Sequence, residues 1–154
     1  MANFLTGNIW TTYQRPNNII LVTTNGVITR NGLVMGAGIA LEAKKLEPLL
    51  PQVLADKALL KASYSRGYMG IIKYGVLFNP MWNIGAFQSK YHFKHDSPLE
   101  LIQYSAEQLN EIAIENGHFV FNVNFPGVGL GKLRPSDVKP VMETLPNNVN
   151  VWSK

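Results

Sequence analysis

The stretch NGLVMGAGIALEAKK (Asn31–Lys45) contains two glycines on either side of an alanine, directly before a run with helical character. The tripeptide Gly36-Ala37-Gly38 has no side chain large enough to cover its backbone N–H groups. The N-terminus of the helix that follows carries about half a positive charge, so this geometry favours a phosphate ligand. Glycines also serve tight turns, and one such loop by itself does not separate the two uses.

A second glycine-rich loop, PGVGLGK (Pro126–Lys132), follows HFVFNVNF (His118–Phe125), which has the composition of a buried strand. The first loop also lies downstream of an apolar, β-branched run, IILVTT (Ile19–Thr24), which ends at the turn Asn25-Gly26. In open α/β sheets, ligands bind beyond the carboxyl ends of the strands, where such loops gather. Two loops of this kind predict a site for a diphosphate.

Strands and helices alternate along the chain, which predicts an α/β fold: a three-layer α/β/α sandwich around a mixed, mostly parallel sheet. Ser97-Pro98-Leu99-Glu100 predicts a helix start in which Ser97 is the cap and Glu100 completes a capping box. Further helices are expected from Ile39 to before Pro48, from Pro51 to about Ala62, and from Pro135. Further strands are expected within Tyr68–Pro80, Ala86–Phe93 and Asn148–Trp152.

The bulk composition indicates one domain with a sizeable core, since 46% of the 154 residues are hydrophobic and only 16% are charged. The absence of cysteine excludes disulfides, thiolate metal sites and a cysteine nucleophile. No apolar stretch approaches the roughly 20 residues that span a bilayer, and the first residues lack a signal-peptide pattern. We therefore expect a cytoplasmic protein without a membrane partner. The net charge of +4 suits an anionic ligand or nucleic acid, although ordinary solvated lysines would give the same excess.

The established phosphate motifs do not fit either loop. Gly-x-x-x-x-Gly-Lys-Ser/Thr is absent, which excludes a nucleoside triphosphatase loop. Leu41 stands where a Gly-x-Gly-x-x-Gly motif would need its third glycine, and no suitably placed acidic residue follows. A Rossmann dinucleotide site is therefore not expected.

Two segments together, TTNGVITRNGLVMGAGIALEAKK (Thr23–Lys45) and NFPGVGLGKLRPSDVKPVMETLPNNVNVW (Asn124–Trp152), resemble the macrodomain family of ADP-ribose-binding α/β/α modules. GNIW (Gly7–Trp10) is similar to an early strand motif of that family. FQSKYHFKHDSPLELI (Phe87–Ile102) resembles the subgroup of ADP-ribosyl glycohydrolases that includes DNA-directed antitoxin macrodomains. The resemblance covers nearly the whole chain and implies a single macrodomain over residues 1–154, with no cofactor and no metal.

The resemblance implies a binding role for particular residues. Asn8, with Ile9 beside it, corresponds to the residue that reads the adenine, and Asn25 corresponds to an asparagine near the distal ribose. The two phosphate loops correspond to Gly36, Ala37, Gly38 and Ile39, and to Gly127, Val128, Gly129, Leu130 and Gly131.

Lys90 corresponds to the lysine that this glycohydrolase subgroup uses. Such an amine attacks the anomeric carbon of the opened ribose, and water resolves the Schiff base that forms. The alternative is a lysine whose stem covers apolar surface while its head reaches water. Some lysine-using relatives pair this residue with an aspartate in the second loop, where Gly131 stands here and can neither relay a proton nor orient water.

The favoured interpretation is a protein that binds ADP-ribose and hydrolyses ADP-ribosyl linkages on a macromolecule, with DNA or protein as the target. The alternatives are a non-catalytic binder of ADP-ribose or of a cyclic nucleotide signal, and an ADP-ribose 1″-phosphate phosphatase. A nucleic-acid module that uses Lys132 and Arg134 is a further, unrelated alternative. We expect a monomer, and no metal at His92 and His95, because no third ligand accompanies them.

Overall fold

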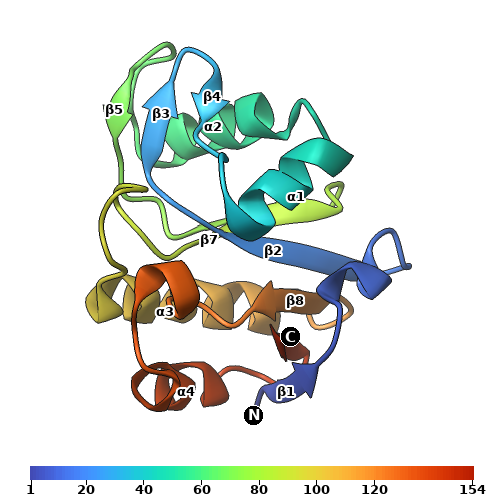
Figure 1. Cartoon of the computed structure of the whole chain (residues 1–154). Helices are drawn as coiled ribbons and strands as arrows, with labels where there is room; N and C mark the ends of the chain where they lie inside the picture. The colour runs from blue at the N-terminus through green and yellow to red at the C-terminus, as the bar shows by residue number, and fades with distance from the viewer.

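A six-stranded sheet runs through the middle of the molecule, with two helices on each face (Figure 1). The computed structural model describes residues 1–154. The sheet has the order β1-β9-β8-β2-β7-β6, and only the β6–β7 pair is antiparallel. Its strands are β1 (Asn3–Thr6), β2 (Asn18–Thr24), β6 (Val76–Leu77), β7 (Ile84–Gln88), β8 (Val120–Asn124) and β9 (Val149–Ser153). The predicted three-layer sandwich around a mixed, mostly parallel sheet is confirmed.

The alternation of side chains along β2 explains why both faces of the sheet are covered. Ile20 and Val22 belong to the core beneath α1 (Gly38–Leu46) and α2 (Leu50–Lys61). Ile19 and Leu21 belong to the core beneath α3 (Leu99–Glu115) and α4 (Pro135–Glu143). A strand that is buried on both faces reads as a continuous apolar run, which is the pattern of IILV in this sequence.

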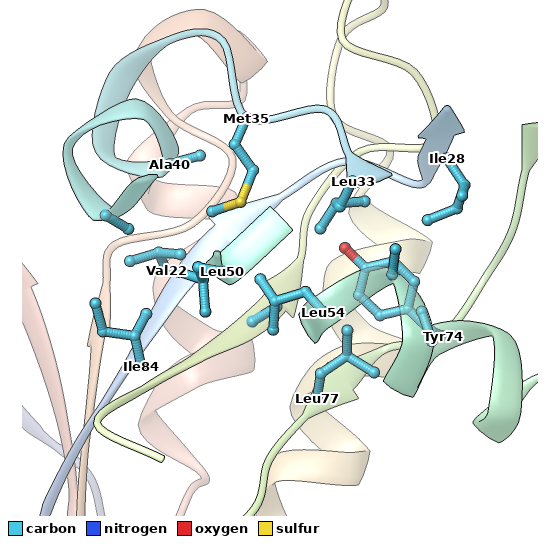
Figure 2. Packing of buried hydrophobic residues seen from close by; sticks show 14 of the residues in the cluster. Val22, Ile28, Leu33, Met35, Ala40, Leu50, Leu54, Tyr74, Leu77 and Ile84 are labelled. Carbon is cyan, nitrogen blue, oxygen red and sulfur yellow. The ribbon is translucent and has the colours of Figure 1, made fainter. Parts of the chain in front are cut away.

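The core on the side of α1 and α2 also anchors the first glycine loop (Figure 2). A small antiparallel sheet, in the order β4-β3-β5, adds Ile28 and Leu33 to this core. Its strands are β3 (Val27–Thr29), β4 (Gly32–Leu33) and β5 (Gly70–Ile71). Met35, which directly precedes the loop, is only 2% exposed and packs in the same core. The buried Met35 side chain thus ties the start of the loop to the body of the protein.

Several local expectations differ from the structure. The strands expected within Tyr68–Pro80 are β5 and β6, which are short because Gly70 (φ 151°) and Gly75 (φ 75°) adopt backbone angles unsuited to a longer strand. The strand predicted over Ala86–Phe93 is β7, which ends at Gln88, so Lys90 lies beyond the sheet.

The segment Gly7–Trp10, which resembles an early strand motif, does not form a strand in the structure. Strand β1 ends at Thr6, and a short 3-10 helix, η1 (Ile9–Thr12), follows with Asn8 as its cap. A second 3-10 turn, η2 (Gly129–Gly131), lies within the second glycine loop.

Candidate functional site

The two glycine loops meet beyond the carboxyl ends of β2, β7 and β8, where they line a cavity of about 420 Å³. These three strands are parallel and adjacent, so their carboxyl ends share one edge of the sheet. A volume of this size lies in the range of small-molecule sites. The predicted residues that line this cavity are Asn25, Gly36, Ala37, Gly38, Ile39, Lys90, Gly127, Val128, Leu130 and Gly131.

The first loop leaves unoccupied space in front of its glycines. Apart from adjoining residues and the backbone of α1 itself, no protein atom lies within 4 Å of the position that a β-carbon would occupy at Gly36 or Gly38. Gly38 has a φ of 56°, which by itself favours glycine, but Gly36 is not left-handed. Neither backbone strain nor packing therefore requires a glycine at position 36, and the space before it belongs to the cavity.

The start of α1 is open to an anion. Ala37 occupies the N-cap position and offers no side-chain hydrogen bond, and no acidic residue lies in the first turn. The first N–H groups of a helix lack intrahelical partners, so these groups are available to an anionic ligand. The positive end of the helix dipole adds to that preference.

The second loop uses its glycines differently. A β-carbon at Gly127 would lie 2.4 Å from Cδ1 of Ile102, and one at Gly131 would lie 2.4 Å from Oγ of Ser97. These two glycines let the loop lie directly against the start of α3. Gly129 has a φ of 67° with no neighbour within 4 Å of a β-carbon, and it does not line the cavity.

Lys90 lies directly beyond β7, and its Nζ atom donates a hydrogen bond to the carbonyl oxygen of Leu130 at 3.2 Å. It is the only side chain with an ionisable group among the residues that line this cavity. The backbone of Lys90 is held by Gln88, whose Nε2 donates to its carbonyl oxygen at 3.2 Å. The lining of the first cavity therefore offers one amine and no carboxylate or imidazole.

A buried polar network lies beneath the cavity. The hydroxyl of Tyr74 donates to the carbonyl oxygen of Asn25 at 2.5 Å, and it also contacts Oγ1 of Thr24 at 2.5 Å. Burial raises the pKa of the Tyr74 hydroxyl above its ordinary value, so the group remains a protonated donor. Gln88 accepts from the backbone N–H of Tyr74 at 2.8 Å. The network holds the ends of β2 and β7 in a fixed relation.

Asn25 has a structural function that the sequence did not indicate. Its Nδ2 donates to the carbonyl oxygen of Val34 at 2.9 Å, and its Oδ1 accepts from the N–H of Val27 at 2.9 Å. These bonds shape the exit of the chain from β2. An amide nitrogen has two N–H groups, so one remains for a ligand at the cavity wall.

A second cavity, also about 420 Å³, adjoins the first and shares Ile39 and Asn124 with it. Asn8 and Ile9 line it. The side chain of Asn8 accepts a hydrogen bond from the N–H of Trp10 at 3.0 Å, which fixes the 3-10 turn there.

The wall of the second cavity also contains an indole and a carboxylate. The Nε1 atom of Trp10 donates to Glu42 at 3.0 Å, and both residues line the cavity. An aromatic surface beside polar groups is suited to a planar heterocycle. The two cavities together form one elongated site.

Several residues that line the two cavities were not predicted as site residues from the sequence, and Asn124 and Ser97 are two of them. Asn124 lines both cavities, and its position directly before the second loop was a usable signal. The prediction of Ser97 as a helix cap was wrong, because Pro98 is the N-cap of α3 and no side chain caps it. Ser97 instead lines the first cavity, and no local pattern indicates this.

The cations of the unrelated nucleic-acid alternative are paired with acidic side chains. Lys132 lies 3.7 Å from Asp96, and Arg134 lies 3.0 Å from Asp137. No group of three or more histidine or acidic side chains is placed to hold a metal ion. None of the helices combines the length and apolarity needed to cross a bilayer.

The sequence and the structure were each compared with known proteins, and only the structure has matches. No protein-family model and no curated protein matches the sequence. The structure is similar to the macrodomain of Thermus aquaticus DarG, with a TM-score of 0.67 and 26% identity over 99% of this chain and 96% of that one. It is similar to the macrodomain of Mycobacterium tuberculosis DarG, with a TM-score of 0.66 and 26% identity over 100% and 99% of the two chains.

A third solved structure, Thermosipho africanus DarTG in complex with ADP-ribose, has a TM-score of 0.68 and 23% identity. The alignment covers 99% of this chain and 42% of that one. The fold of this chain is that of a macrodomain. Among macrodomains, it is of the type found in DarG, which confirms the resemblance seen in the sequence.

Proposed function

We propose that this chain binds ADP-ribose in the elongated site and removes ADP-ribosyl groups from a modified macromolecule, DNA or protein. The observation that carries the proposal is the space in front of Gly36, where neither packing nor backbone strain excludes a side chain. A diphosphate between the two loops would occupy that space and meet the open N–H groups at the start of α1. The similar structure of Thermosipho africanus DarTG was solved in complex with ADP-ribose, which supports the same ligand for this chain.

The shape of the site suggests how the ligand lies. The adenosine would enter the second cavity, beside Asn8 and Ile9, and the diphosphate would pass between Gly36 and the second loop. The distal ribose would then reach the end of the first cavity that contains Lys90. Asn25, on the same wall, retains one N–H group for that ribose.

In this arrangement Lys90 would act as the nucleophile. Its uncharged amine attacks the anomeric carbon of the opened distal ribose, the bond to the target breaks, and the leaving group takes a proton. Water then adds to the resulting C=N bond and releases ADP-ribose and the free lysine. Its hydrogen bond to the carbonyl oxygen of Leu130, at 3.2 Å, uses an N–H of the amine and would leave the nitrogen lone pair free for the attack.

A binder that does not cut is the second candidate, and one observation favours it. Lys90 is the only ionisable side chain lining the first cavity, so no second group is present there to relay protons. Under this alternative, Lys90 would only hold the second loop through Leu130.

Two assays on one preparation separate the candidates. Calorimetry with ADP-ribose measures binding, and a gel assay with ADP-ribosylated DNA and ADP-ribosylated protein measures release. Binding with release supports the hydrolase, and binding without release on either substrate supports the binder. No binding would contradict both candidates.

A further inference from the structure

The hydroxyl of Ser97 is a buried polar group without a partner. Ser97 is 4% exposed, and its Oγ is the only buried side-chain oxygen or nitrogen in the chain that makes no hydrogen bond. Buried hydroxyl groups in folded proteins are normally paired, because an unpaired one loses its hydrogen bonds to water without compensation. An alanine at this position would avoid that cost, so the hydroxyl requires another explanation.

Helix capping does not supply the explanation. Ser97 precedes Pro98, which is the N-cap of α3, and no side-chain hydrogen bond caps that helix. The Ser97 backbone, by contrast, is well held, since its N–H donates to the carbonyl oxygen of Gly131 at 3.0 Å. The residue is firmly placed at the cavity wall, and only its hydroxyl lacks a partner.

The second loop makes room for this hydroxyl. A β-carbon at Gly131 would lie 2.4 Å from Ser97 Oγ and 3.0 Å from Ser97 Cβ, which leaves no room for a side chain unless Ser97 moves. Gly131 has no left-handed φ, so its backbone conformation does not require glycine. The contact with Ser97 is therefore the constraint on a side chain that the structure shows at position 131.

Ser97 lies at the same end of the cavity as Lys90. Two consecutive carbonyl groups of the second loop accept from these residues, that of Leu130 from Lys90 Nζ at 3.2 Å and that of Gly131 from Ser97 N at 3.0 Å. Both residues line the cavity. In this structure the Ser97 oxygen is buried against Gly131, and rotation about χ1 to another staggered position would turn it toward a ligand without movement of the backbone.

We propose that Ser97 is a ligand-binding residue whose hydroxyl forms a hydrogen bond with a hydroxyl group of the distal ribose. The inference rests on the proposed function, since it takes ADP-ribose as the ligand. It gives the site a means to distinguish ADP-ribose from ADP, which has the same adenosine and diphosphate but no distal ribose. The unpaired hydroxyl of the protein would find its partner only in the complex.

The test compares Ser97→Ala with wild type by calorimetric titration of ADP-ribose and, separately, of ADP. Loss of one hydrogen bond to the distal ribose should weaken ADP-ribose binding about tenfold and change ADP binding by less than about twofold. The melting temperature of Ser97→Ala should be equal to that of wild type or higher, because no intramolecular hydrogen bond is lost.

Ser105→Ala is the matched control for stability. Its hydroxyl is also buried, but it donates to the carbonyl oxygen of Gln88 at 2.7 Å, so this variant should melt at a lower temperature. Equal weakening of ADP and ADP-ribose by Ser97→Ala, or no weakening of either, would overturn the inference. A lower melting temperature for Ser97→Ala would also overturn it. If wild type binds neither nucleotide, the proposed function fails first, and the inference fails with it.

Discussion

The Nζ atom of Lys90 donates a hydrogen bond to the carbonyl oxygen of Leu130 at 3.2 Å, so the candidate nucleophile is held by the loop that would enclose its substrate. The contact joins two segments, one after β7 and one after β8, that the parallel sheet brings to the same edge. If Lys90 acts as the nucleophile, this hydrogen bond would orient its uncharged amine, because the bond uses an N–H and leaves the nitrogen lone pair for the attack.

Replacing Lys90 with alanine should lower the rate of ADP-ribose release at least about 100-fold while changing ADP-ribose affinity less than about threefold. Borohydride added during turnover should reduce the C=N bond in wild type and leave a covalent ADP-ribosyl adduct, detectable by intact mass. Lys94→Ala is the control, since this exposed lysine does not line the cavity. An adduct that persists in Lys90→Ala would exclude Lys90 as the nucleophile.

Replacing Gly36 with valine should fill the space that we assign to the diphosphate. We expect ADP-ribose affinity to fall at least about 30-fold, while the free energy of unfolding changes by only about 0.5 kcal/mol, because no atom beyond the adjoining residues lies within 4 Å of the new β-carbon. Gly117→Val is a matched control: it too has no neighbour within 4 Å and no left-handed φ, and it lies outside both cavities. Calorimetry and thermal melts on both variants test this prediction. Equal ADP-ribose affinities of Gly36→Val and Gly117→Val would refute it.

Replacing Tyr74 with phenylalanine should destabilise the protein by about 1–3 kcal/mol. The substitution leaves the carbonyl oxygen of Asn25 and the hydroxyl of Thr24 without their buried partner. Tyr64→Phe is the control, because Tyr64 is 42% exposed. Urea denaturation gives the free energies of unfolding. Equal values for the two variants would show that the network contributes little to stability.

Gly131 and Ser97 should be energetically coupled. Gly131→Ala should lower stability, because its β-carbon would lie 2.4 Å from Ser97 Oγ. Ser97→Ala removes that oxygen, so the double variant should be more stable than the sum of the single effects by about 0.5–2 kcal/mol. A double-mutant cycle by urea denaturation measures this coupling. Strict additivity would mean that the serine simply rotates away from the new methyl group.

The stability of the protein should depend on pH through Lys61. Burial, with a smaller contribution from the neighbouring Lys57, lowers the pKa of Lys61 from 10.5 to about 8. The unfolded chain therefore binds more protons than the folded chain between these pH values, so this lysine adds stability as pH rises through that window. Relative to Lys61→Met, wild type should gain about 1 kcal/mol between pH 8 and 10.5, after allowance for the solvent that reaches the amine. The prediction would be contradicted if the free energies of unfolding of the two proteins changed by the same amount across this pH range.

The layered fold could be predicted from the sequence because its signals are local. The apolar run of β2, the glycines before α1 and the prolines near helix ends each act on the backbone within a few residues. The position of a ligand site beyond the parallel strands follows from the fold class alone. Strands do form within Tyr68–Pro80, as expected, but composition alone did not show that they are as short as β5 and β6, which the backbone angles of Gly70 and Gly75 interrupt.

The sequence by itself determined where a phosphate-binding loop could form, since the small residues at Gly36 and Gly38 leave the backbone open wherever the loop lies. Only the tertiary structure decided which glycines face a cavity and which pack closely against a neighbouring segment of the chain. Gly36 faces open space, whereas Gly131 lies against Ser97. The pairing of Lys90 with Leu130 was likewise decided by the fold. Such contacts depend on how parallel strands distant in sequence align their carboxyl ends, and no local pattern contains that information.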